Sequence, residues 1–107
     1  MKFAILGSGN GARALCAQIA AKGNQVKMWE PLERTEDFCK LQKTKRIYLQ
    51  GDVNICGNLT DVTMDIADAV RFAEVVLVVV PAFAHAPIFS KLIPYLENGQ
   101  HVIIIPG

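Results

Sequence analysis

The residues with the clearest chemical meaning are the glycines near the start of the chain. The stretch from Gly7 to Ala12 stands between an apolar run and an alanine-rich segment. Glycine is favoured where the backbone turns at positive φ, or where a ligand must approach the backbone closely. A strand that ends in such a turn and opens a helix presents unpaired N–H groups, at the positive end of the helix dipole, to an anion. The stretch therefore predicts a phosphate site.

The spacing Gly7-x-Gly9-x-x-Ala12 matches the dinucleotide fingerprint in its alanine variant. In that pattern Gly7 makes the tight turn, Gly9 lets the pyrophosphate approach, and the small Ala12 packs the helix on the strand. The motif alone is a weak signal, since an ordinary strand-to-helix turn can match it. Its position directly after the first strand strengthens it. We expect six consecutive residues to form this part of a cofactor site: Gly7, Ser8, Gly9, Asn10, Gly11 and Ala12.

An acidic residue follows the motif at the distance that the fingerprint requires. Glu30 comes after the second apolar segment, and Pro31 blocks further strand pairing. A carboxylate here can accept hydrogen bonds from both ribose hydroxyls of an adenosine, and it would repel a 2′-phosphate. We therefore expect the cofactor to be NAD in preference to NADP. The basic residues that begin at Arg34 fit a solvated helix face, and Glu30 with Arg34 could also be a simple surface pair.

Composition excludes several classes of protein. The chain has 107 residues, of which 51% are hydrophobic and 20% charged, with a net charge of +1. These values fit one globular domain, and they favour neither disorder nor a basic surface for nucleic acid. The longest apolar run, Val75 to Val80, is too short to span a bilayer, and the start of the chain does not resemble a signal peptide. We expect a cytoplasmic protein with no membrane partner.

The cysteines and histidines do not show the spacing of a metal site or a disulfide framework. The three cysteines are odd in number and include no C-x-x-C pair, and the two histidines stand far apart. We expect free thiols and no metal. The residues concerned are Cys16, Cys39, Cys56, His85 and His101.

Short apolar runs predict strands around the motif, and apolar residues at helical spacing predict helices between them. Strands are expected at residues 3–6, 25–29, 59–64, 75–80 and 102–105. Helices are expected at residues 12–22, 32–44, 66–73 and 87–96, with a small hairpin at 46–58. Val75 to Val80 is apolar on both faces, which is typical of a strand covered by helices on both sides. Asp65 is placed to cap the helix that follows it.

The last helix and strand carry more detailed expectations. Pro87 should open the helix, Pro94 should kink its final turn, and the strand at 102–105 should be buried. The helix should pack through one apolar stripe formed by Ile88, Phe89, Leu92, Ile93 and Leu96.

The alternation of elements predicts an α/β fold: a Rossmann-type, doubly wound parallel sheet of about five strands in the order 3-2-1-4-5, within three αβα layers. Ligands bind such sheets where the strand order reverses, here between the first and fourth strands. The loop at 81–86 should therefore lie beside the glycine loop. Four of its residues complete the expected cofactor site: Pro81, Ala82, Phe83 and His85.

Two of these four residues have simpler alternative roles. Phe83 offers an aromatic face to a nicotinamide, but it could instead pack on the edge of the sheet. His85 offers an imidazole near the same place, but it could cap the next helix or face solvent. The sequence leaves both alternatives open.

The chain resembles the N-terminal part of the octopine/nopaline (opine) dehydrogenase family. The resemblance is carried by residues 3–12, by Val-Pro-Ala-Phe-Ala-His at 80–85 and by Ile-Ile-Pro-Gly at 104–107. Glycerol-3-phosphate dehydrogenase-like cofactor domains share the layout. The resemblance implies an oxidoreductase that condenses an amino acid with a 2-oxo acid and reduces the product with NADH or NADPH.

The resemblance supplies no catalytic residue. In the opine family the histidine and aspartate that handle the proton belong to a helical C-terminal domain, and no position here matches them. We therefore expect residues 1–107 to be a truncated N-terminal dinucleotide-binding domain that is inactive alone. A glycerol-3-phosphate dehydrogenase-like domain and a non-catalytic NAD-sensing module remain alternatives. The apolar strand at 102–105 would lie at a sheet edge, where a homodimer could form.

Overall fold

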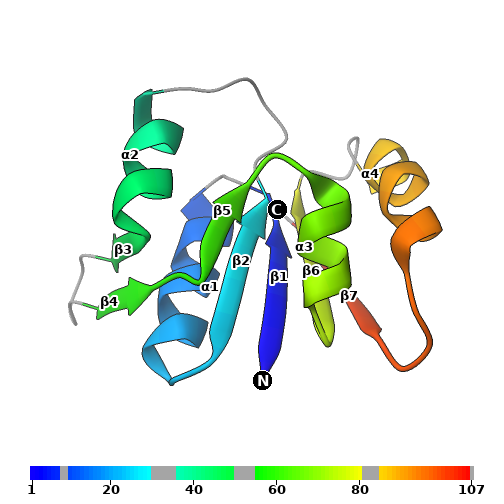
Figure 1. Cartoon of the computed structure of the whole chain (residues 1–107), viewed down its shortest axis with the longest axis horizontal. Helices are drawn as coiled ribbons and strands as arrows, with labels where there is room; N and C mark the ends of the chain where they lie inside the picture. The colour runs from blue at the N-terminus through cyan, green and yellow to red at the C-terminus, as the bar shows by residue number, and fades with distance from the viewer. Residues whose placement is uncertain (8–9, 30–35, 50–54, 81–84, 107) are drawn as a thin grey trace.

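The sheet has the strand order that the sequence predicts. The computed structural model describes residues 1–7, 10–29, 36–49, 55–80 and 85–106 (Figure 1). Its main sheet runs in the order β5-β2-β1-β6-β7, and every neighbouring pair is parallel. With the separate hairpin left out of the numbering, this is the order 3-2-1-4-5 of a doubly wound Rossmann-type fold. The strands are β1 (Lys2–Leu6), β2 (Gln25–Trp29), β5 (Asp61–Thr63), β6 (Val75–Val80) and β7 (His101–Pro106).

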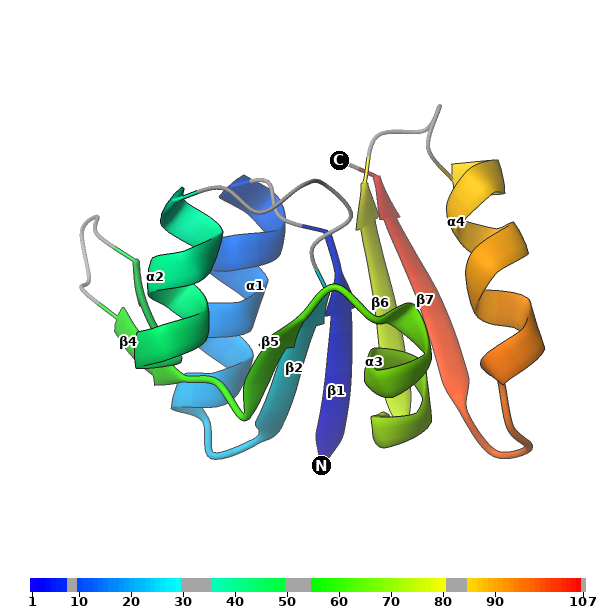
Figure 2. The same ribbon diagram turned by 45° about the horizontal axis from the view of Figure 1, so that its top comes forward.

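Helices cover both faces of the sheet (Figure 2). Helix α1 (Asn10–Ala21) and helix α2 (Glu36–Thr44) contribute to one core, and α3 (Ile66–Phe72) with α4 (His85–Leu92) contributes to the other. Alternate residues of β6 enter the two cores, and all six are buried. This explains the uninterrupted apolar run, because a strand covered on both sides has no face for polar side chains.

The predicted hairpin is present and packs on α1. Strands β3 (Arg46–Leu49) and β4 (Ile55–Asn58) pair antiparallel, while the turn at 50–54 lies outside the described residues. Gly57 lets β4 approach the helix closely, because a Cβ there would lie 2.8 Å from the carbonyl oxygen of Ala17 and 3.0 Å from the Cβ of Ala20. Small residues on both sides therefore set the distance between hairpin and helix.

Both ends of α3 are capped by side chains. Asp65 Oδ1 accepts a hydrogen bond from the N–H of Ala67 at 3.0 Å, as the sequence predicts. At the other end Gln100 Nε2 donates to the carbonyl oxygens of Val70 and Ala73, each at 2.7 Å. The Val70 carbonyl also accepts from the N–H of Ala73 at 3.2 Å, so Gln100 adds a second donor at the carboxyl end of the helix, where carbonyls lack full intrahelical bonding. One amide thus joins the end of α3 to the turn that precedes β7.

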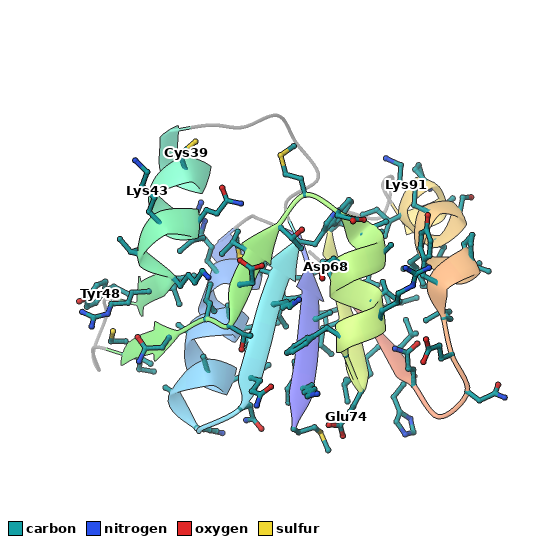
Figure 3. All side chains as sticks on the ribbon, in the orientation of Figure 1. Cys39, Lys43, Tyr48, Asp68, Glu74 and Lys91 are labelled. Carbon is teal, nitrogen blue, oxygen red and sulfur yellow. The ribbon has the colours of Figure 1, made fainter. Side chains whose placement is uncertain are left out.

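A charged residue in β2 is accommodated at the flank of α3. Lys27 Nζ lies 2.9 Å from Asp68 Oδ1 and 4.8 Å from the centre of the Phe72 ring. Asp68 projects from α3 on the side of β2 (Figure 3). The ammonium group therefore keeps an anionic and an aromatic partner where the helix does not cover the strand.

The last helix differs from three expectations. Helix α4 begins at His85, so Pro87 occupies its third position, where the first turn still tolerates the missing N–H. The α-helix ends at Leu92, and residues 93–95 form a 3₁₀ turn that contains the predicted proline. Ile93 is 57% exposed, so it does not belong to the buried stripe.

The strand at 102–105 is not buried. Strand β7 is the edge of the sheet, and Ile103 and Ile104 are each about half exposed. An apolar run is compatible with a central strand or with an edge strand whose outer side is bare, and hydropathy does not separate the two. The predicted edge position is correct and the predicted burial is wrong.

The close contact at Gly57 predicts a measurable cost for any side chain. We expect Gly57→Ala to lower the free energy of unfolding by about 1 to 3 kcal/mol, the usual cost of overpacking. Gly11→Ala is the matched control, since its Cβ would meet only Val79 Cγ1 at 3.8 Å. Within a helix that change is neutral or stabilising by up to about 1 kcal/mol. Urea unfolding of both variants tests this, and equal effects would contradict the packing argument.

Candidate functional site

The candidate site lies at the carboxyl ends of β1, β2 and β6. These strands are parallel and in register, with Leu6 opposite Trp29 on one side and Val78 on the other. Their ends therefore meet at one edge of the sheet, together with the first residues of α1 and α4 (Figure 2). The strand order reverses between β1 and β6, which is where ligands bind in sheets of this type.

Gly7 is fixed between the two neighbours of β1. Its N–H donates to the carbonyl oxygen of Trp29 at 3.0 Å. On the other side, a Cβ at this residue would lie 2.3 Å from the carbonyl oxygen of Val79, and φ is +144°. Both the contact and the backbone angle exclude a side chain. The first glycine of the motif is thus required by the strands themselves.

The start of α1 is suited to an anion. The helix begins at Asn10, and its first turn contains no acidic side chain. The N–H groups of that turn lack intrahelical acceptors, and the helix dipole gives them partial positive charge. Gly11 is exposed, whereas Ala12 is buried in the core between α1 and the sheet. The small residue of the motif therefore packs the helix on the sheet, as predicted.

The end of β2 is held firmly. Trp29 is 4% exposed, and its indole Nε1 donates to the carbonyl oxygen of Met64 at 3.0 Å. Glu30 follows directly in the chain but lies outside the described residues. Its role toward a ribose stays a prediction, although the backbone that leads to it is fixed. The Trp29 to Met64 contact carries no signal in the sequence, because the two residues belong to different elements.

Part of the predicted site lies beyond the described residues. His85 is described only by its backbone, as the first residue of α4, so the role of its imidazole remains a prediction. Val80 ends β6 directly before the second predicted loop. The predicted site residues that fall outside the described ranges are Ser8, Gly9, Glu30, Pro81, Ala82 and Phe83.

The described residues do not form a metal centre. Within the described ranges no group of three or more His, Cys, Asp or Glu side chains could hold a metal ion. Cys16 is buried in α1, and desolvation raises the pKa of its thiol to about 12, with the charge of Arg13 acting in the opposite direction. Such a thiol stays protonated near neutral pH and is not a nucleophile. None of the described helices is long and apolar enough to cross a membrane.

An open cavity of about 320 Å³ lies at the opposite end of the sheet. Its lining includes Met1, Glu74 and His101, which are exposed and belong to the amino ends of the strands. It contains no residue of the predicted cofactor site. Because dinucleotides bind at the carboxyl ends of such strands, we do not assign the cofactor to it.

The comparison with protein families agrees with this geometry. Residues 2–106 match the family described as NAD-dependent glycerol-3-phosphate dehydrogenase N-terminus. An opine dehydrogenase from Arthrobacter sp. (strain 1C) is 36% identical over 98% of this chain. A glycerol-3-phosphate dehydrogenase [NAD(P)+] from Pelotomaculum thermopropionicum is 33% identical over 99% of it. The chain spans 29% and 30% of those two proteins.

Solved structures give the same result. Octopine dehydrogenase with NADH and L-arginine superimposes with a TM-score of 0.86 and 25% identity, covering 99% of this chain and 28% of that one. Glycerol-3-phosphate dehydrogenase from Coxiella burnetii shares the fold, with a TM-score of 0.76 over 96% of this chain and 31% of that one, at 21% identity. The chain therefore belongs to the family of NAD-dependent glycerol-3-phosphate dehydrogenase N-terminal domains, and it is a dinucleotide-binding dehydrogenase domain similar to that of opine dehydrogenase.

Proposed function

We propose that the chain is the NADH-binding domain of an opine dehydrogenase-like oxidoreductase. In that reaction the amino group of an amino acid condenses with a 2-oxo acid, and the imine is reduced. The observation that carries the proposal is the close approach of Gly7 to the Val79 carbonyl beside the open start of α1, since this is the geometry that a pyrophosphate needs. The Val-Pro-Ala-Phe-Ala-His stretch supports the opine class in particular.

The proposed binding roles follow the order of the strands. The turn after β1 holds the pyrophosphate, Glu30 at the end of β2 accepts hydrogen bonds from the adenosine ribose, and the residues after β6 line the nicotinamide side. When bound, the cofactor supplies the hydride, while these residues bind and orient it. The residues proposed for binding are Gly7, Ser8, Gly9, Asn10, Gly11, Ala12, Glu30, Pro81, Ala82, Phe83 and His85.

A glycerol-3-phosphate dehydrogenase-like function is the second candidate, because the matching family model carries that description. We assign no catalytic residue in this chain for either reaction, and we expect no turnover by the 107 residues alone. We also propose a cytoplasmic location, and a purely NAD-sensing role is the third candidate function. Turnover by the chain with an amino acid and 2-oxo acid pair would instead make His85 the first catalytic candidate.

The turn after β1 provides the direct test of dinucleotide binding. We expect Gly7→Ala to weaken NADH binding at least about tenfold, because the new Cβ must displace the Val79 carbonyl and so move the turn. Gly99→Ala is the matched control, since this glycine also has positive φ, at +90°, but lies in open space before β7. Calorimetric titration of both variants measures the effect. Equal affinities of the two variants for NADH would show that the turn after β1 does not bind the cofactor.

The choice of cofactor tests Glu30. We expect the wild-type chain to bind NADH more tightly than NADPH, because the carboxylate repels a 2′-phosphate. Glu30→Ala should weaken NADH binding about 10- to 100-fold, the usual worth of hydrogen bonds to a charged group, and should abolish the preference. Parallel titrations with both cofactors give the answer. Wild-type affinity that is equal for the two, or higher for NADPH, would refute this role of Glu30.

The bare edge of the sheet leads to a proposal about association. Strand β7 carries half-exposed Ile103 and Ile104 and contains no lysine, and its outer side offers backbone groups to another strand. We expect the chain to form a homodimer through β7 and Ile104→Lys to weaken it. Sedimentation at several concentrations measures the association. A strictly monomeric wild-type chain at high concentration would contradict the proposal.

A further inference from the structure

Met64 occupies a specific place at the carboxyl edge of the sheet. It directly follows β5, which pairs in parallel with β2 so that Thr63 lies opposite Trp29. Met64 is thus one residue beyond the end of β5, beside the end of β2. Its side chain is 43% exposed. Core packing does not explain so large an apolar group at this position.

The backbone around Met64 is fixed by hydrogen bonds on two sides. The buried indole of Trp29 donates to the Met64 carbonyl at 3.0 Å. The N–H of Asp65 donates to Thr63 Oγ1 at 3.0 Å, and Asp65 in turn caps α3. The thioether is therefore presented from a rigid turn. A flexible, polarisable thioether on a fixed backbone is suited to contact an aromatic ring.

The strand order determines which part of a dinucleotide reaches this turn. This step rests on the proposed function, in which the pyrophosphate lies at the end of β1 and the adenosine ribose at the end of β2. Neighbouring strands are only about 4.8 Å apart, so the ends of β2 and β5 lie side by side. Continuing in the same direction from β1 through β2 leads to β5, so the base attached to that ribose reaches the end of β5.

We propose that Met64 packs against the adenine ring of the cofactor and contributes to the affinity for the adenosine half. The contact is apolar and adds no charge, so it acts equally on NADH and NADPH. In this arrangement the Met64 contact at β5 contributes affinity for adenosine, whereas Glu30 at β2 discriminates between a ribose with and without a 2′-phosphate. Trp29 is the positioning residue, because its indole holds the carbonyl of Met64 in place.

The experiment compares three ligands by calorimetry on the 107-residue chain: NADH, ADP-ribose and reduced nicotinamide mononucleotide. We expect Met64→Ala to weaken the binding of NADH and of ADP-ribose about three- to tenfold and to leave the affinity for the mononucleotide unchanged. Met64→Leu should keep both affinities within about twofold, because it preserves the apolar volume. Ile93→Ala is the control, since it removes an exposed apolar side chain from the 3₁₀ turn after α4 and should alter the affinity for none of the three ligands.

Trp29 supplies a second readout, because it is the only tryptophan in the chain and touches Met64. ADP-ribose should change its emission in the wild type, and less so in Met64→Ala. Unchanged affinity for NADH and ADP-ribose in Met64→Ala, with normal wild-type binding, would overturn this inference and leave the proposed function intact. Equal weakening of all three ligands would also overturn it. A wild-type chain that binds no dinucleotide would refute the proposed function and this inference together.

Discussion

The approach of Gly7 to the carbonyl oxygen of Val79 is the constraint on which the site depends. The residue stands between β2, to which its N–H is bonded, and β6, whose backbone leaves no room for a Cβ. A side chain here would force β6 away from β1 and move the first turn of α1. The absence of a Cβ at Gly7 thus lets β1 and β6 pair closely and lets α1 begin where Ala12 is buried.

The two ends of the sheet are built differently. At the amino ends side chains close the structure: Gln100 satisfies carbonyls of α3, and Glu74 Oε1 accepts a hydrogen bond from the N–H of Lys2 at 3.3 Å. At the carboxyl ends the first turn of α1 carries no acidic cap. Polar side chains also fix the carboxyl end of β5, where Asp65 caps α3 and the Trp29 indole bonds the Met64 carbonyl, so the contrast between the two ends concerns the start of α1.

Local signals made much of the fold predictable. The tight turn at Gly7, the cap at Asp65 and the apolar run of β6 each depend on residues close together in sequence, and all three are present in the structure. Contacts between distant residues were not predictable. The amide of Gln100 reaches carbonyls 27 and 30 residues away, and the indole of Trp29 reaches Met64. Periodicity also could not show that β7 is only half buried, because burial depends on what covers the strand.

The central pairing of β1 with β6 has a consequence for the order of folding. It joins segments about 72 residues apart, as the bond between Lys2 and Glu74 illustrates. Loop-closure entropy makes such contacts slow to form, so the unit of β1, α1 and β2 can assemble before β6 arrives. Until then Gly7 is bonded to β2 alone, through its N–H to the carbonyl oxygen of Trp29, and lacks the contact with β6. During synthesis the turn after β1 thus meets its second neighbour only after the chain has passed Val79.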